Sequence, residues 1–189
     1  MGRTYDAVDD RLRAFLVRQP MFFVATAPLA ADGHVNVSPK GMRGTFRVLD
    51  NRRVAYLDLT GSGIETVAHL RENGRITLMF CAFEGPPRIV RLHGTGRAVV
   101  PGDDEFDALA PGFAAIDGTR SVIVVDVTRI ADSCGYAVPR LDYVGERDNL
   151  VHWAETRGSG GLEAYRRERN AESIDGLPGL PAADALEGR

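Results

Sequence analysis

The sequence predicts a mainly β fold with peripheral helices (α+β), in which an antiparallel sheet closes into a barrel. Short apolar or alternating segments follow one another with short turns between them, and only one or two helical segments interrupt the series. The chain shows no repeated strand-helix unit of the kind that builds a parallel sheet. Its 189 residues, 44% hydrophobic and 26% charged, suit one globular domain with a tail.

The first elements follow from apolar spacing and turn residues. Residues 5–20 place apolar side chains at nearly helical spacing and end at Pro20, which predicts an N-terminal helix. Residues 21–28 indicate a buried strand, the pair Asp32-Gly33 indicates a hairpin turn, and residues 34–38 indicate a second strand. Residues 45–50 and 54–59 predict the third and fourth strands.

The later strands differ in pattern. Residues 75–83 are apolar on both faces, as expected of a central strand. Residues 88–100 alternate, so that Arg91 and His93 share a polar face with positions 89, 95 and 97. A short acidic helix at 101–111 and a β-branched strand at 121–130 complete the predicted barrel.

Beyond the predicted barrel the chain becomes irregular. Two helical pieces are expected around residues 151–156 and 161–170, followed by a Gly- and Pro-rich end that is extended or frayed. We therefore divide the chain into a barrel domain at 1–132, which includes the N-terminal helix, and an extension at 133–189 that packs on the barrel or on a partner.

Charge and cysteine content exclude several classes of protein. A formal charge of -3 and a pI near 5.8 argue against nucleic-acid binding, while small anionic ligands remain possible. No apolar run has the length of a signal peptide or membrane span, so we expect a cytoplasmic protein with no membrane partner. Cys81 and Cys134 lack metal-ligand spacing and are expected to be reduced, buried thiols.

Lysine usage singles out one residue. Of the 23 basic side chains, all but Lys40 are arginine. A lone lysine among arginines suggests a site that requires a compact point charge and not a planar guanidinium. A lysine that occurs by chance on a surface turn explains the pattern equally well.

The segment from Tyr56 to Gly74 indicates a strand, a small-residue loop and a helix. Ser62 and Glu65 have the spacing of a capping box, and Gly74 suits the left-handed residue after the helix. The same loop suits a phosphate, since glycines expose backbone amides and a helix N-terminus carries about half a positive charge. The residues alone leave both interpretations open.

Other catalytic patterns are weak. Ser38 lacks a GxSxG elbow, and no HExxH or carboxylate cluster indicates a catalytic metal. His34, His69 and His152 carry no functional pattern, and the role of His93 stays open.

The order of elements, with "VNVSPKG", "YLDLTGSGIETVAHLREN" and "RITLMFCAF…RIVRLHG", resembles the pyridoxamine 5′-phosphate oxidase-like family of FMN-binding split barrels. The resemblance spans about residues 15–130, and the tail looks like that of an uncharacterised bacterial branch. It implies an FMN-dependent oxidoreductase that forms a homodimer with FMN at the subunit interface and uses a small-molecule substrate or a donor such as NAD(P)H. It also implies the cofactor-binding residues Ser38, Lys40, Gly41, Tyr56, Leu57, Asp58, Thr60, Gly61, Ser62, Gly63 and Arg91.

The chain departs from the family pattern at one point. Pyridoxamine phosphate oxidases carry an arginine and a lysine in the phosphate loop, where this chain has small residues around Ser62. The substrate therefore stays unassigned, and so does any catalytic acid or base. Two alternatives share the fold: a non-catalytic flavin or haem binder, and a deazaflavin-dependent reductase.

Overall fold

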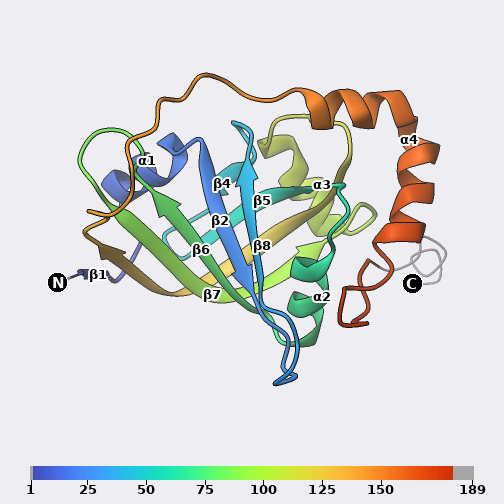
Figure 1. The fold of residues 1–189 in the computed structure, drawn as a ribbon, viewed down its shortest axis with the longest axis horizontal. Coiled ribbons are helices and arrows are strands. Elements are labelled where there is room, and N and C mark those ends of the chain that lie inside the picture. The colour runs from blue at the N-terminus through green and yellow to red at the C-terminus, as the bar shows by residue number, and fades with distance from the viewer. Residues whose placement is uncertain (1, 181–189) are drawn as a thin grey trace.

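The computed structural model describes residues 2–180. Its strands form one antiparallel sheet in the order β3-β2-β6-β7-β8-β5-β4, with β1 paired to β8, and the sheet curls into a split barrel (Figure 1). The elements are β1 (Thr4–Tyr5), α1 (Asp10–Arg18), β2 (Met21–Thr26), β3 (Asn36–Gly41), β4 (Phe46–Val48), β5 (Arg53–Leu59), α2 (Glu65–Glu72), β6 (Arg75–Cys81), β7 (Ile89–Val99), α3 (Asp104–Leu109), the 3₁₀ turn η1 (Ala110–Gly112), β8 (Thr119–Ser133) and α4 (Asn149–Arg169). The predicted antiparallel barrel with peripheral helices is confirmed.

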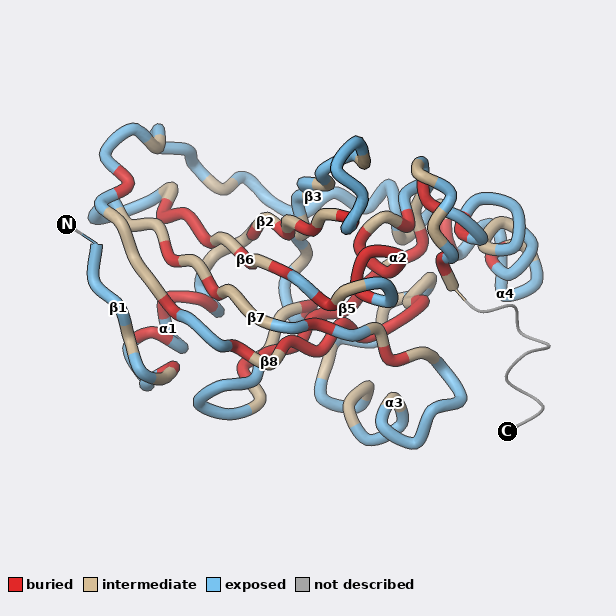
Figure 2. Tube along the Cα trace, turned by 90° about the horizontal axis from the view of Figure 1, so that it is seen from below, coloured by how far each residue is buried: buried red, intermediate tan, exposed pale blue. Residues whose placement is uncertain are grey.

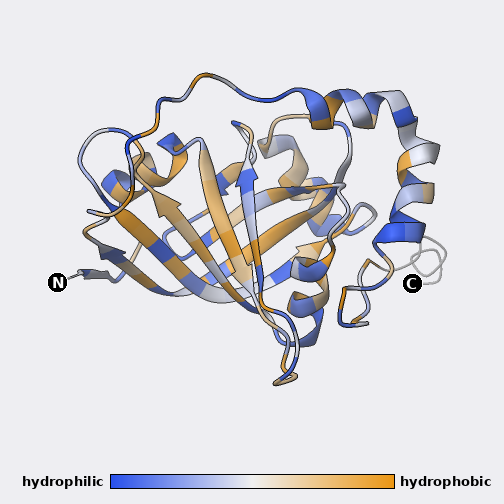
Figure 3. Ribbon diagram, in the orientation of Figure 1, coloured by the Kyte–Doolittle hydropathy of each residue, from blue (hydrophilic) through white to orange (hydrophobic). Residues whose placement is uncertain are grey.

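The main core fills the inside of the barrel. Strand β2 alternates buried and half-buried residues, so Phe22 and Val24 point inward. Phe22 stacks on Phe80 with ring centroids 5.1 Å apart, and Tyr56 and Phe46 meet Phe22 at 5.4 Å. Apolar and buried segments concentrate on these strands in Figures 2 and 3. This aromatic cluster and its aliphatic neighbours hold the two halves of the sheet together.

A smaller apolar cluster lies outside the barrel. Leu57 and Val124 belong to it, and Phe106 and Phe113 from the α3–η1 segment pack against it. The segment therefore covers the outer face of β5 and β8. These two strands are buried on both faces, which explains the continuous β-branched sequence of β8.

The alternation predicted for the polar strand is present in β7. Arg91 and His93 are half-buried on the outer face, while Val90 and Leu92 are fully buried inside. A register shift between His93 and Gly94 marks an irregularity opposite β8.

Two local predictions are wrong. Strands β2 and β3 do pair as an antiparallel hairpin, but residues 27–35 form a long connection, and Gly33 does not have the positive φ of a tight Asp-Gly turn. Helix α2 begins at Glu65 with Ile64 as N-cap and no side-chain cap, so Ser62 does not form the predicted capping box. Gly74 does adopt the predicted left-handed conformation, with φ of 71°.

The C-terminal part first crosses the barrel and then turns down its side (Figure 1). Residues 136–148, here called the strap, have no regular structure and lead into α4. Gly158 (φ 62°, ψ 176°) interrupts α4, which agrees with the two predicted helical pieces. Residues 171–180 fold back beside α2, and the predicted frayed end at 181–189 lies outside the described residues.

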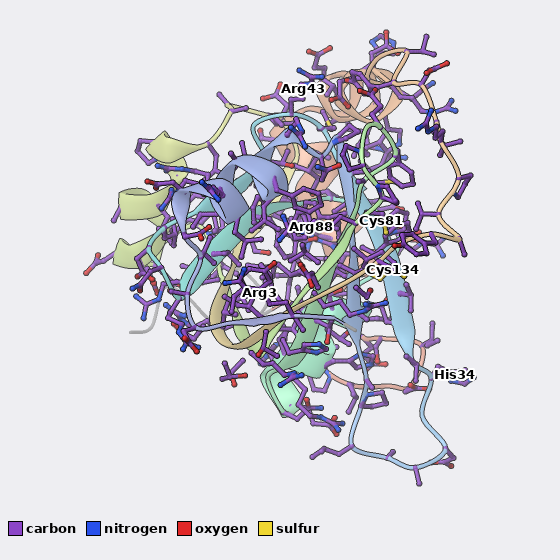
Figure 4. The ribbon with its side chains drawn as sticks, turned by 90° about the vertical axis from the view of Figure 1, so that its left-hand side faces the viewer. Arg3, His34, Arg43, Cys81, Arg88 and Cys134 are labelled. Carbon is purple, nitrogen blue, oxygen red and sulfur yellow. The ribbon has the colours of Figure 1, made fainter. Side chains whose placement is uncertain are left out.

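Figure 4 shows His34 and Arg43 at opposite ends of the molecule. The His34 backbone N–H donates to Asp175 Oδ2 over 2.8 Å, and the His34 Nδ1 lies 2.7 Å from Asp175 Oδ1, which ties the β2–β3 connection to residues 171–180. Both cysteines are free; Cys81 is buried as predicted, but Cys134 is exposed, contrary to the prediction. Within residues 2–180, no helix has the length and apolarity needed to cross a bilayer.

Candidate functional site

The split of the barrel is bridged by an ion pair. Strand β3 is one end of the sheet and β4, beside β5, is the other. Lys40 Nζ from β3 donates to Asp58 Oδ1 from β5 over 3.1 Å. Asp58 has no exposed surface, whereas the Lys40 side chain keeps 22% exposure. The only lysine of the chain therefore closes the open side of the barrel while remaining accessible to a ligand.

Arg120, at the start of β8, makes the second ion pair with Asp58. Its Nε donates to Asp58 Oδ2 over 2.7 Å, and the guanidinium is 4% exposed. Its Nη1 donates to Asn170 Oδ1 over 2.8 Å, and its Nη2 donates to the Gly63 carbonyl over 2.8 Å. A longer bond of 3.4 Å joins Nη1 to the Gly61 carbonyl. All three guanidinium nitrogens are thus engaged, and Arg120 acts as a buried clamp on the loop.

The clamp sets the direction of the loop amides. The carbonyl oxygen and the next N–H of a trans peptide point in opposite directions, so carbonyls held inward by Arg120 turn the N–H groups of Ser62 and Ile64 away from it. Within residues 2–180, the N–H groups of positions 61–64 donate to no protein acceptor. Ser62 and Gly63 are exposed. The loop therefore has unpaired amides, of which those of Ser62 and Gly63 belong to exposed residues, whereas Ile64 is buried.

Helix α4 completes the cluster from the C-terminal part. Arg166 Nε donates to Thr60 Oγ1 over 2.9 Å, and its Nη2 donates to the Thr119 carbonyl over 3.2 Å. Asn170 is fully buried and donates to the Gly61 carbonyl over 2.9 Å. The start and end of the loop are consequently held by residues far away in sequence.

The charges in this cluster do not balance. The buried part of the cluster holds three cations, Lys40, Arg120 and Arg166, and the carboxylate of Asp58, while the carboxylates of Glu65 and Glu163 lie at its edge. Burial alone would raise the pKa of Asp58, but Lys40 and Arg120 lower it to about 2, so the group is ionised at neutral pH. Burial and the charge of Arg120 both lower the pKa of Arg166. In the buried part the cations outnumber the carboxylate, which favours an added anion there, whereas Glu65 and Glu163 oppose an anion at the edge.

The protein itself covers one flank of the loop. Glu65 Oε1 accepts from the Ile174 N–H over 3.4 Å, and Arg71 donates to the Gly179 carbonyl. The carboxylate of Glu65 also lies beside Gly63, where an added Cβ would come within 2.6 Å of it. The carboxylate of Glu65 therefore opposes an anion on the Gly63 flank, while the space beside Gly61 is open.

The structure brings together some of the predicted site residues. Lys40, Asp58, Thr60, Gly61 and Gly63 meet in the cluster, and Ser62 lies at its surface. Ser38 lies on the same face of β3 as Lys40 and donates to Asn36 Oδ1 over 2.8 Å. Asn36 in turn donates to Thr26 and Thr66. This polar row extends the cluster along β3.

The other predicted residues lie elsewhere. Tyr56 and Leu57 are buried in the two apolar clusters, so only their backbone is available to a ligand. Gly41 is exposed at the end of β3. Arg91 lies on the outer face of β7 and donates to Ser133, so it is not near Lys40 within one chain.

Sequence reasoning missed Arg120, Arg166 and Asn170. Arg120 could have been noticed, because a guanidinium at the edge of an otherwise β-branched, apolar strand requires a buried partner. No comparable signal marks Arg166, which is one of several arginines in a polar helix, or Asn170 at its end.

Residues 8–134 match the family model described as pyridoxamine 5′-phosphate oxidase, which covers more than half of the chain. The chain belongs to this family. It is 42% identical over 195 residues to the pyridoxamine 5′-phosphate oxidase family protein ustO of Aspergillus flavus, covering 95% of this chain and 78% of ustO. Because ustO is a fungal protein, the likeness is not limited to bacterial members.

Solved structures show the same fold. A crystal structure of a histidine-to-alanine variant of HupZ from Group A Streptococcus has a TM-score of 0.54 and 23% identity, covering 67% of this chain and 99% of HupZ. A second HupZ structure has a TM-score of 0.52, 23% identity, and coverage of 65% and 90%. At this identity the likeness concerns the fold of the family, and residue roles come from the geometry of this chain.

Proposed function

We propose that this member of the pyridoxamine 5′-phosphate oxidase family is an FMN-dependent oxidoreductase. The observation that carries the proposal is the cationic cluster of Lys40, Arg120 and Arg166 beside a loop, residues 61–64, whose N–H groups have no acceptor within residues 2–180. Family membership supports the same assignment, since the family motifs of this chain supply both β3 and the loop.

The residues of the cluster fit a phosphate-bearing cofactor. A phosphate brings negative charge and several hydrogen-bond acceptors, which match the surplus cations and the unpaired N–H groups. The small residues Gly61, Ser62 and Gly63 leave the loop open on its exposed side. They take the place of the arginine and lysine expected in the phosphate loop of pyridoxamine phosphate oxidases, so the cations reach the site from β3, β8 and α4 instead.

In this proposal the protein binds and orients the cofactor. Bound FMN would supply reversible two-electron redox chemistry. Lys40 would keep a positive charge next to the cofactor, because Asp58 holds its ammonium in place while part of its surface stays accessible. Ser38 would contribute its hydroxyl oxygen, whose hydrogen is already donated to Asn36. No residue is assigned as general acid or base.

A homodimer would complete the site. The outer face of the β3-β2-β6-β7 half of the sheet carries Phe23, Met79, Val37 and Pro39 in neighbouring rows, and Val37 is 62% exposed. An apolar sheet face of this kind favours association with another protein surface. Arg91 lies on this face, so in a dimer it could serve the partner's cofactor, as the family resemblance implies.

The dimer is testable by mutation of the sheet face. We expect wild-type protein to have the molar mass of a dimer in light scattering, and Val37→Glu to shift it toward the monomer, because a buried carboxylate opposes association. Leu29→Glu is the control, since Leu29 is 64% exposed but lies in the β2–β3 connection. A wild-type monomer that binds FMN would contradict the dimeric site.

FMN binding is testable by titration followed by flavin absorbance and fluorescence. We expect saturable binding of one FMN per chain, and a Kd that rises about tenfold in Lys40→Ala, because one charge-assisted contact is lost. Arg53→Ala is the control, since Arg53 forms an exposed ion pair with Asp126 on the same strand as Asp58. Equal FMN affinity in Lys40→Ala and wild type would remove Lys40 from the site.

Turnover separates the possible functions on this fold. Reduction of bound FMN by NADH or NADPH, followed by reoxidation with an acceptor, is expected of the oxidoreductase. Tight FMN binding without reduction would instead indicate a carrier or sensor. Preferential binding of a deazaflavin or of haem in the same titration would contradict FMN as the cofactor.

A further inference from the structure

A cavity of about 470 Å³ lies between the strap and one end of the barrel. Its walls come from the start of β2, the end of β3, the segment after β6, and the strap with the first residues of α4. The volume lies within the range of small-molecule pockets. Its apolar lining residues are Pro20, Met21, Met42, Phe83, Leu141 and Leu150.

Two attachments hold the strap across this cavity. The Leu141 N–H donates to the Phe83 carbonyl over 3.2 Å. Farther along, Glu146 Oε1 accepts from the Arg43 N–H over 3.0 Å, and the Arg43 guanidinium lies 4.8 Å from the centre of the Tyr143 ring. Figure 4 shows Arg43 at this end of the molecule. The strap is thus fixed on both sides of the cavity.

Met42 lies in the wall in an unusual conformation. Its φ is 72°, and it is the one non-glycine residue with positive φ within residues 2–180. This conformation costs a non-glycine residue about 1–2 kcal/mol. The Thr45 hydroxyl stabilises the turn, because its single hydrogen lies within reach of the Met42 carbonyl at 2.7 Å and the Gly41 carbonyl at 2.9 Å. A glycine at position 42 would avoid the cost but would leave no side chain in the cavity. Met42 therefore contributes a flexible apolar side chain to the wall from a strained backbone position.

The charged groups of the lining are mainly acidic. Glu84, Asp142 and Glu146 contribute three carboxylates and Arg147 one guanidinium, and the Arg43 guanidinium lies over the lining residue Tyr143, so the carboxylates exceed the cations by one. Neither Glu84 nor Asp142 forms an ion pair with a described residue of the chain. Negative charge at the edge of an apolar cavity attracts cations and repels anions.

We infer that the strap cavity is a binding site for a small molecule with an apolar body and a neutral or cationic polar group. The apolar walls take the body, and the carboxylates disfavour an anionic ligand such as a sugar phosphate or a carboxylate. The chemistry differs from that of the cationic cluster, which favours anions, so the two sites select different molecules.

Gly41 connects the two sites, because it lines the cavity and directly follows Lys40. A ligand in the cavity would lie next to the strand that holds the proposed cofactor. The assignment of this ligand as the substrate rests on the proposed function, whereas binding in the cavity does not.

The test uses N-phenyl-1-naphthylamine, a neutral probe whose fluorescence rises in apolar surroundings, with the full-length wild-type protein. We expect saturable binding that Leu141→Asp weakens at least about tenfold, because a carboxylate replaces an apolar wall. Val144→Asp is the matched control: Val144 lies on the same strap, is 98% exposed and does not line the cavity. It should change the Kd less than about twofold.

Two ligands of similar shape and opposite charge test whether the cavity prefers a cation to an anion. We expect 1-naphthylmethylammonium to displace the probe at a concentration at least about tenfold lower than 1-naphthylacetate, and Glu84→Gln to reduce this preference without loss of the neutral probe. Equal effects of Leu141→Asp and Val144→Asp, or absence of probe binding, would overturn the site. Preference for the acetate would overturn the ligand class.

FMN titration of the same variants separates this inference from the proposed function. Leu141→Asp should bind FMN like wild type. If FMN fails to bind while the probe shows the expected differences, the cavity stands without the flavin. If FMN binds and the probe does not distinguish the variants, the flavin stands without the cavity.

Discussion

Replacing Asp58 with asparagine should lower the free energy of unfolding by about 3–5 kcal/mol, because it removes the one carboxylate that compensates the buried charges of Arg120 and Lys40. The side chain keeps its size, so the loss comes from electrostatics and not from a cavity. Denaturant unfolding at pH 7 measures it. Asp126→Asn is the control, since Asp126 is 51% exposed and pairs at the surface with Arg53; its effect should stay below about 1 kcal/mol.

The free energy of unfolding of Asp58→Asn should also depend on pH differently from that of wild type. The folded-state pKa of Asp58, about 2, lies below the ordinary value of 3.8, so ionised Asp58 stabilises the fold above pH 4. Wild type should lose this contribution, about 2 kcal/mol, as the pH falls from about 4 toward 2. Asp58→Asn lacks it, so the two stability curves should converge in acid. Parallel curves over this range would show that Asp58 is not the stabilising ion.

Arg120→Lys tests the clamp on the loop. Lysine can keep an ion pair with Asp58, but it cannot reproduce a planar fork that reaches Gly63 and Asn170 at once. We expect the free energy of unfolding to fall by about 2–4 kcal/mol, because buried carbonyl and amide oxygens lose their donor. We also expect FMN affinity to fall at least about tenfold, since the loop amides are no longer held outward.

Arg129→Lys is the matched control, because Arg129 lies on the same strand and is exposed. Both properties should remain close to those of wild type in this variant. If Arg120→Lys loses stability but keeps full FMN affinity, residues 61–64 are a structural loop and the cofactor binds elsewhere. The experiment therefore separates the structural role of the clamp from its proposed role in binding.

The two sequence interpretations of the loop after β5 were a capped helix start and an anion site. The structure contradicts the capping box, because Ile64 and not Ser62 is the N-cap and Glu65 reaches Ile174 instead. The loop is shaped by Arg120 and Asn170, which hold its carbonyls inward. The unpaired amides of the loop are a consequence of that clamp, and the proposed function requires them as donors to the cofactor.

The cationic cluster and the strap cavity are neighbours, but they favour ligands of different charge. Lys40 and the loop form a cationic region inside the split of the barrel, while the cavity next to Gly41 is apolar with an acidic edge. A cofactor that carries phosphate and a second ligand that carries no negative charge could occupy the two without competition.

The sequence by itself determined the secondary structure and the class of fold. Apolar and polar residues alternate in β7, and β8 is a β-branched run. These patterns show which faces of the strands are buried, because successive residues of a strand point to opposite sides of the sheet. Lys40, Asp58 and the glycine loop could be proposed because family motifs mark them. The exceptions were the Asp32-Gly33 turn, which is part of a long connection, and Ser62, where local capping propensity was overruled by contacts from distant segments.

Only the tertiary structure decided the partners of those residues. Asp58 meets Arg120 from a strand 62 positions later, and Gly61 meets Asn170 from 109 positions later. Arg91 lies on the opposite face of the sheet from Lys40, because the two strands present alternate residues to the two sides. Such contacts depend on how the sheet curls and where α4 returns, and those depend on the packing of the whole core, which no local pattern records.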